Sequence, residues 1–407
     1  MNKPEVLSPA GDRESFLTAL RYGADAVYLA GKNFGMRTAS KNFSAEELKL
    51  ACEKAHQLKK KVYLTCNTLP RNADLPQMPD FLRQAEAYGV DAFIIADLGV
   101  FEMAKRYAPS VERHISTQGG IINYESALAW YQLGAKRVVL AREMRLEEIA
   151  ELRSRIPDAL EIECFVHGAM CVSFSGRCLI SSFMTGRDAN RGDCAQPCRW
   201  KYHLVEENRP GEYFPVEENE KGTYLYNSRD LCMIEHIPAL VKAGVNSLKI
   251  EGRAKTYYYT AVTTNAYRHA IDEYFDHRDD PTYRLSPWIR EELEKISHRA
   301  YSTGFFFGEP GQETESGGYI RHYNAVAVCE ESLSDTVAVI TQRNKFLVGD
   351  TLDILPPDGF SYEVKCLRLT NEEGEEVPSA PHPMQKLWIT ADRRIPKGSV
   401  IRKRNDI

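Results

Sequence analysis

Half of the chain's 10 cysteines fall within residues 161–199, a stretch in which glycine and serine are frequent. Beyond the apolar run that opens this stretch, the cysteines are irregularly spaced, at Cys171, Cys178, Cys194, Cys198 and Cys232. Thiols on a flexible loop can converge on one metal, and iron–sulfur clusters and structural zinc sites both need about four of them. The stretch therefore predicts a metal centre.

The spacing of these thiols favours a 4Fe–4S cluster over zinc. A zinc ribbon usually shows two CxxC pairs, and this region contains none. A zinc site, a catalytic thiol and inert cysteines are the alternatives. Cys164 alternates with apolar residues in a strand-like run, so we interpret it as a small buried side chain, and we interpret Cys52, Cys329 and Cys366 in the same way.

The composition is that of a water-soluble globular protein, with 43% hydrophobic and 27% charged residues and a net charge of −5. No run of about 18 apolar residues occurs, so we expect no membrane span. The first residues lack the apolar core of a secretory signal, and we therefore expect a cytoplasmic protein. In a reducing compartment, clustered cysteines bind metals or catalyse rather than form disulfides.

Four segments repeat one pattern, in which a glycine follows an amphipathic stretch and an apolar run begins shortly afterwards. They are residues 22–29, 88–95, 133–140 and 243–250. A glycine in this place takes the left-handed conformation that ends a helix. The apolar run that follows is typical of a buried parallel strand, so the repeats indicate a βα barrel or a doubly wound sheet.

The number of strand-like runs distinguishes these two folds. We find eight, at residues 5–10, 26–31, 61–67, 92–97, 112–118, 137–143, 161–168 and 247–253. Eight βα units predict a TIM-type (β/α)8 barrel, and no glycine-rich dinucleotide turn is present. The connection after the seventh run is by far the longest and holds the cysteines, so residues from about 168 to 240 form the predicted cluster-binding insertion.

A second, smaller domain follows the barrel. Helices over residues 257–274 and 288–301 are expected to close the barrel domain, which we place at residues 1–315. Six short alternating strands then predict a small antiparallel β-barrel over residues 319–407. Its last strand is basic, which indicates either a solvated edge or a contact with nucleic acid.

The region around the first cysteines resembles the signature of the peptidase U32 family. It reads ECFVHGAMC from Glu163 to Cys171 and continues as SFSGRCLIS after one valine. The likeness extends over the barrel, through LSPAGD, GADAVYLAG, STQ at residues 116–118, RGDCAQPCR and SLKIEGR. The trailing β-domain is similar to the C-terminal domain of the family.

The family name implies proteolysis, and a collagenase-like peptidase is the alternative function. The chain shows neither a GxSxG elbow nor an HExxH zinc helix. The members that it resembles are instead oxygen-independent hydroxylases of RNA or quinones that carry an iron–sulfur cluster. Its length and β-barrel are similar to the tRNA hydroxylation branch, which implies 5-hydroxyuridine formation at the wobble position of tRNA with prephenate as co-substrate. A third hypothesis is a subunit whose site a second protein completes.

The resemblance also implies a ligand set. In the family the ligands are two signature cysteines, one after the next glycine-containing turn, and one much later. They match Cys171, Cys178, Cys194 and Cys232 in this sequence, and Cys198 is the rival of Cys194 for the third place.

Residues at the carboxyl ends of barrel strands point into the active site of such folds. Arg142 and Arg253 are the first candidates for binding a dianionic acid such as prephenate, because guanidinium groups suit carboxylates. Glu143 and Glu251 could act there or simply pair with these arginines. His167 could serve the cluster, relay protons or be a packed core residue. Further polar residues at strand ends are Arg37, Asn67, Asp97, Gln118 and Lys249.

Overall fold

The computed structural model describes residues 2–36, 40–171, 173–174, 177–200, 203–204, 214–215, 228–310 and 319–405, the two dipeptides at 203 and 214 by their backbone alone. Arg37, one of the strand-end candidates, lies outside the described residues.

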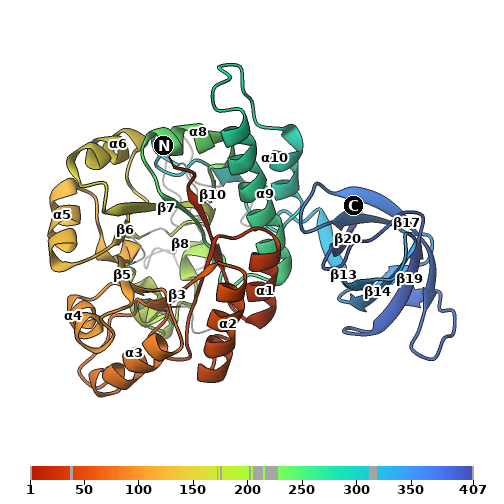
Figure 1. Ribbon diagram of the computed structural model, residues 1–407, viewed down its shortest axis with the longest axis horizontal. Coiled ribbons are helices and arrows are strands. Elements are labelled where there is room, and N and C mark those ends of the chain that lie inside the picture. Colours follow the sequence, from red (N-terminus) through yellow and green to blue (C-terminus); the bar gives the residue numbers. More distant parts are fainter. Residues whose placement is uncertain are drawn as a thin grey trace.

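Within these residues, eight parallel strands close into a barrel surrounded by helices, which confirms the predicted TIM-type fold (Figure 1). The strands are β1 (Glu5–Pro9), β2 (Ala26–Leu29), β3 (Lys61–Cys66), β4 (Ala92–Ile95), β5 (Glu112–Ile115), β6 (Arg137–Val139), β7 (Glu161–Ala169) and β11 (Ser247–Ile250). β11 pairs in parallel with both β7 and β1, so the ring has no open edge.

The helices that cover the barrel begin and end where the sequence supplies caps. They are α1 (Arg13–Arg21), α2 (Ala45–Gln57), α3 (Met78–Ala87), α4 (Leu98–Tyr107), α5 (Tyr124–Leu133), α6 (Leu146–Arg155), α8 (Ile237–Lys242) and α9 (Tyr257–Asp276). Ser44 and Glu47 form a capping box at the start of α2. The glycines of the four repeats, Gly23, Gly89, Gly134 and Gly244, all have positive φ, as the repeat pattern predicts.

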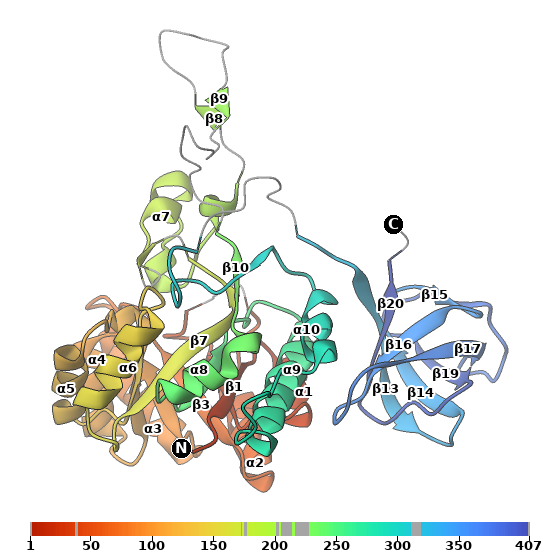
Figure 2. The same cartoon turned by 90° about the horizontal axis from the view of Figure 1, so that it is seen from above.

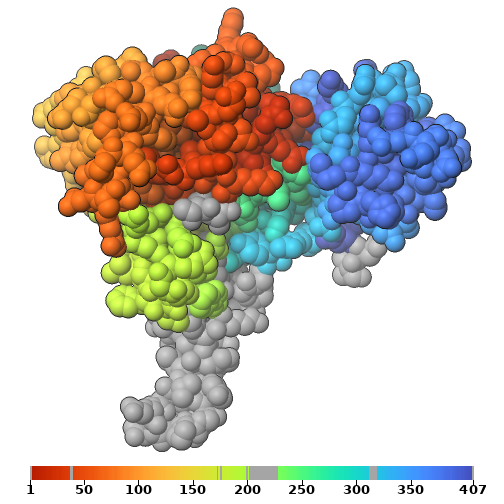
Figure 3. Space-filling model, turned by 90° about the horizontal axis from the view of Figure 1, so that it is seen from below, coloured from red at the N-terminus to blue at the C-terminus, as the bar shows by residue number. Residues whose placement is uncertain are grey.

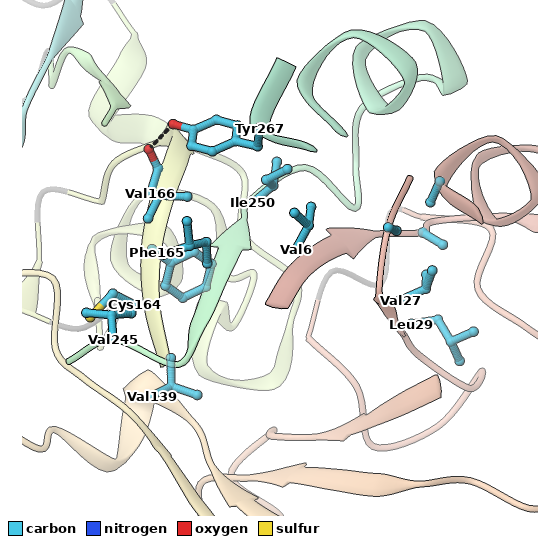
Figure 4. Close-up of a cluster of buried hydrophobic side chains, with 14 of the residues drawn as sticks. Val6, Val27, Leu29, Val139, Cys164, Phe165, Val166, Val245, Ile250 and Tyr267 are labelled. Carbon is cyan, nitrogen blue, oxygen red and sulfur yellow. Dashed lines mark hydrogen bonds between the residues drawn. The ribbon is translucent and has the colours of Figure 1, made fainter. Parts of the chain in front are cut away.

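Side chains alternate between the two faces of each strand. On β1 and β2, Val6, Val27 and Leu29 belong to the large core between strands and helices, and Figure 4 shows them together with Ile250. The intervening Leu7 and Tyr28 belong to a smaller cluster of barrel residues. The inward-facing positions of a barrel therefore decide what its interior can bind.

The barrel interior also contains a layer of charged side chains. Arg137 donates to Glu5 at 2.7 Å and to Glu163 at 3.0 Å, and Lys249 donates to Glu163 at 2.6 Å. Burial opposes ionisation of Glu5, yet the Arg137 guanidinium prevails and lowers the pKa of this carboxyl to about 2. Burial likewise opposes ionisation of Glu163, but Lys249 and Arg137 together keep its pKa below the ordinary value.

Some predicted boundaries were wrong. β5 ends at Ile115 because a 3-10 turn follows directly at Thr117–Gly119, and β6 has only 3 residues. The helix predicted over residues 288–301 is α10 (Pro287–Glu294), after which the chain extends into β12 (Tyr301–Ser302). Hydrogen bonds to strand neighbours replace the last helical turns.

The insertion after β7 contains α7 (Ile180–Thr185), β8 (His203–Leu204), β9 (Phe214–Pro215) and β10 (Asp230–Cys232). β10 runs antiparallel to β7, with Leu231 opposite Gly168 and Cys232 opposite His167. α7 projects beyond one end of the barrel (Figure 2). Gly168 is required at this crossing, because a Cβ there would lie 2.5 Å from the Glu251 carbonyl oxygen and φ is +106°.

A closed antiparallel barrel follows, as predicted. Its strands are β13 (Tyr323–Ser332), β14 (Val337–Gln342), β16 (Thr351–Leu355), β17 (Tyr362–Thr370), β19 (Lys386–Ala391) and β20 (Val400–Arg404). β15 (Phe346–Leu347) and β18 (Ser379–Ala380) form a separate small ribbon. The stretch 346–355 is thus two strands rather than the single one that its sequence suggests.

The two domains meet through buried polar contacts. The Tyr22 hydroxyl on the barrel side donates to the Leu355 carbonyl at 2.8 Å and accepts from the Val400 amide at 3.1 Å. Arg402 is fully buried and binds Glu292 of α10 at 2.7 Å and Asp353 at 2.9 Å. The central arginine of the basic last strand is therefore part of the domain interface, and is neither a solvated edge nor free to contact nucleic acid.

No helix among the described residues is long and apolar enough to cross a membrane.

Candidate functional site

A cavity of about 280 Å³ lies at the carboxyl ends of the barrel strands. Six predicted strand-end or site residues line it: Asn67, Gln118, Arg142, Lys249, Glu251 and Arg253. Four cysteines of the insertion line it as well: Cys171, Cys178, Cys194 and Cys198. The barrel thus brings most of the predicted site residues to one place.

The cysteines of the cavity differ in exposure. Cys171 is exposed, Cys178 is buried, and Cys194 and Cys198 are half-buried. The backbone amide of Ile180 donates to Sγ of Cys178 and that of Gln196 donates to Sγ of Cys194, both at 3.3 Å. Amide donors of this kind surround the sulfurs of iron–sulfur sites and stabilise thiolates. The donor set therefore fits the predicted cluster.

Cys232 lies elsewhere. It is on β10, opposite His167, and is not among the residues that line the cavity. Burial raises the pKa of its thiol to about 11. Within the described residues, no three Cys, His, Asp or Glu side chains form a group arranged to hold a metal ion. The ligand assignment stays a prediction.

His167 is enclosed by aromatic rings. It is 1% exposed, and its ring centroid lies 5.6 Å from that of Tyr267 and 5.4 Å from that of Tyr301. Burial lowers its pKa to about 3, so the imidazole is neutral near pH 7. It does not line the cavity.

The cations of the cavity are held by backbone and ring contacts. Arg142 donates to the Ala169 carbonyl at 2.9 Å, and its guanidinium carbon lies 4.2 Å from the centre of the Phe165 ring. Arg253 is buried and donates to the Met36 carbonyl. Burial lowers the pKa of Lys249, although Glu163 opposes this shift. Three cationic side chains thus face one small space, a suitable arrangement for an anion.

Of the two predicted glutamates, only Glu251 lines the cavity, and Glu143 does not. The sequence reasoning missed Tyr28, Met36 and Thr65, which also line it. Thr65 could have been found from the alternation on β3, since Tyr63, Thr65 and Asn67 share the face that points into the barrel.

The insertion adjoining the cavity carries exposed apolar side chains. They are Phe174, Leu179, Phe183, Met184 and Trp200, of which Phe183 is 85% exposed. Figure 3 shows the described part of the insertion standing out from the barrel surface. Arginines lie among these side chains, and Arg187 and Arg191 bind Asp193 and Asp74 at 2.7 and 2.6 Å. Exposed aromatic rings beside guanidinium groups are typical of surfaces that stack nucleotide bases.

Comparison with known proteins places this arrangement in a family. The tRNA hydroxylation protein P of Escherichia coli (strain K12) is 35% identical over 100% of this chain and 97% of its own length. The tRNA hydroxylation protein P1 of Bacillus subtilis (strain 168) is 36% identical over 98% of this chain and 95% of its own length. The 23S rRNA 5-hydroxycytidine C2501 synthase of E. coli is 36% identical over 74% of this chain and 45% of its own length.

Residues 11–316 match Peptidase family U32, and residues 321–402 match the Peptidase family U32 C-terminal domain. The matched ranges cover the cavity, the cysteine-bearing insertion and the antiparallel barrel, so this chain belongs to the U32 family.

Proposed function

We propose that this protein is an oxygen-independent tRNA hydroxylase that forms 5-hydroxyuridine at the wobble position, with a 4Fe–4S cluster and prephenate as co-substrate. The observation that carries the proposal is the meeting of cluster-type thiols and three cations in one cavity. The relatives named for hydroxylation of tRNA and rRNA support RNA as the substrate class.

Cys171, Cys178 and Cys194 would hold the cluster together with one further thiol. Cys198 shares the cavity wall with these three, whereas Cys232 matches the family's late ligand but lies on β10. A bound 4Fe–4S cluster supplies electron transfer or an open iron position for substrate. Iron content of anaerobically purified Cys198→Ala and Cys232→Ala variants distinguishes the two assignments.

The cavity's own cations would bind the carboxylates of the co-substrate. Arg142 lies over Phe165, which fixes the plane of its guanidinium. Arg253 is fixed through Met36, and Lys249 is neutralised by Glu163. Arg142 and Arg253 are therefore proposed to recognise the two carboxylates, with Glu251 keeping the net charge of the cavity low.

The test combines two measurements. Iron and sulfide are quantified after anaerobic purification, and nucleosides are analysed in tRNA from a deletion strain complemented with wild-type or variant genes. We expect about four irons per chain, and restored 5-hydroxyuridine with the wild-type gene alone. A colourless wild-type protein that restores the nucleoside would contradict the cluster part of the proposal.

A peptidase makes the opposite prediction, namely gelatin cleavage that survives Cys194→Ala. A Cys171–His167 nucleophile pair is the arrangement it would need. Cys171 lines the cavity, but His167 does not and lies among tyrosines. The geometry of the described residues therefore favours the hydroxylase.

A further inference from the structure

Two buried polar atoms face the cavity without a hydrogen-bond partner among the described residues. They are Oγ1 of Thr65 and Oε1 of Gln118. The two side chains are 2% and 4% exposed, and both line the cavity. Buried polar atoms in folded proteins are nearly always paired, so two unpaired atoms facing one cavity indicate a ligand.

Gln118 is held so that only its carbonyl oxygen is left for a ligand. Its Nε2 donates to the Met36 sulfur at 3.8 Å, and its backbone carbonyl accepts from the Arg177 guanidinium. Thr65 is closed in from one side by Gly35, where a Cβ would come within 2.9 Å of Oγ1. Both side chains are thus fixed by their surroundings, with their free atoms directed to the cavity.

The chemistry of these atoms restricts the ligand. A carboxamide oxygen accepts hydrogen bonds and requires an N–H or O–H donor, which an ionised carboxylic acid does not have. A threonine hydroxyl can donate to a carbonyl. The ring-sized space between them and the apolar walls formed by Tyr28, Ile94 and Phe165 suits a flat heterocycle.

We propose that Gln118 and Thr65 bind the imide edge of a uracil base turned out of an RNA strand into the cavity. Oε1 of Gln118 accepts the N3–H, and the Thr65 hydroxyl donates to an adjacent carbonyl of the base. This pose leaves the C5–C6 edge of the ring facing the remainder of the cavity. The inference rests on the proposed RNA substrate and assigns the residues that select the base, as enzymes acting on extruded bases do.

The experiment uses the full-length protein and fluorescent RNA hairpins of anticodon stem-loop size. The target nucleotide is uridine in one hairpin and 3-methyluridine, which has no imide N–H, in the other. Anisotropy titrations give the ratio of the two dissociation constants. For wild type we expect the 3-methyluridine hairpin to bind about tenfold more weakly.

Substitutions then assign the ratio to the residues. In Gln118→Leu we expect the ratio to fall to about one, because the uridine hairpin loses its acceptor. Gln118→Glu retains an acceptor and keeps part of the ratio. Thr65→Val, which preserves side-chain shape, weakens binding of both hairpins alike. Gln57→Leu, the same change on the exposed end of α2, leaves the ratio as in wild type.

Three results would overturn the inference. A wild-type ratio near one would show that the imide N–H is not recognised. A ratio that persists in Gln118→Leu would show that the methyl group acts by its bulk alone. Failure of wild type to bind either hairpin would instead contradict the proposed RNA substrate itself, together with the inference built on it.

Discussion

The two barrels of this protein place charge on opposite sides of their walls. The large barrel encloses Arg137, Glu163 and Lys249, and it opens into a cavity at one end. The small barrel encloses apolar side chains such as Ile340, Leu352 and Ile401, and its buried Arg402 faces the neighbouring domain. A polar interior costs stability but can bind substrate, whereas an apolar one gives stability alone. The chemistry therefore belongs to the large barrel, and the small barrel's buried charge serves docking.

The largest expected effect is on the cysteines of the large barrel. Cys178→Ala should abolish iron binding and 5-hydroxyuridine formation, because one of the proposed thiolates is lost. The matched control is Cys366→Ala in the core of the small barrel. The control should lose about 1 kcal/mol of stability and keep its iron. Loss of iron from both variants would break the comparison between the barrels.

The next largest effect concerns the interface. Arg402→Met leaves Glu292 and Asp353 buried without their guanidinium partner. We expect a loss of about 3–5 kcal/mol in the free energy of unfolding, measured by urea denaturation. Arg404→Met, at an exposed position of the same strand, should change it by less than about 0.5 kcal/mol. Equal effects of the two substitutions would contradict a docking role for Arg402.

The charged interior should make the large barrel the more acid-sensitive of the two. The pKa of Glu5 is lowered from 4.5 to about 2 in the folded state. Its contribution to stability is therefore present above about pH 4.5, the unfolded pKa, and is lost as the pH falls towards 2. We expect a loss of roughly 2–3 kcal/mol across this window.

Hydrogen exchange measured by mass spectrometry between pH 5 and pH 3 locates this effect, after correction for the intrinsic pH dependence of exchange. Peptides of β1 and β7 should lose protection before those of β13 and β14. Glu5→Gln should remove much of the pH dependence of the large barrel at a cost in its stability at neutral pH. An earlier loss of protection in the small barrel would sink the idea.

The smallest effect is expected on the surface of the insertion. Phe183 is 85% exposed, so Phe183→Ser should leave the melting temperature unchanged. If its ring stacks on RNA, hairpin affinity should fall about five- to tenfold. The control is Leu367→Ser, at a similarly exposed position on β17 of the small barrel. A matching fall in affinity for Leu367→Ser would shift part of the RNA surface to the other barrel.

The repeating parts of the fold could be predicted from the sequence because local signals decide them. Gly134 ends α5 in the left-handed conformation, and the apolar run that follows forms β6. Non-local pairing decided the remainder. Residues 230–232 form a strand only because β7 extends past the barrel and offers its edge. Tyr301, expected to end a helix, instead extends beside Asp230 of β10.

The cavity was predictable as far as strand ends could be identified, which gave Gln118, Arg142 and Arg253. Thr65 was missed because a threonine within a strand is ordinarily a β-forming residue with no further meaning. The basic last strand was misleading for a related reason. Its sequence shows a cation at residue 402, but the acidic partners Glu292 and Asp353 come from distant parts of the chain.

The Tyr22 hydroxyl reaches across the domain boundary to main-chain atoms alone, the carbonyls of Leu355 and Gly398 and the amide of Val400. A contact made to backbone does not depend on which side chains the partner strand carries. Homologous small barrels could therefore be exchanged onto this large one, provided that the strand path is kept and Arg402 retains its acidic partners. The joint between the domains is in this sense tolerant of evolutionary drift, and it offers a natural seam for building chimeric proteins.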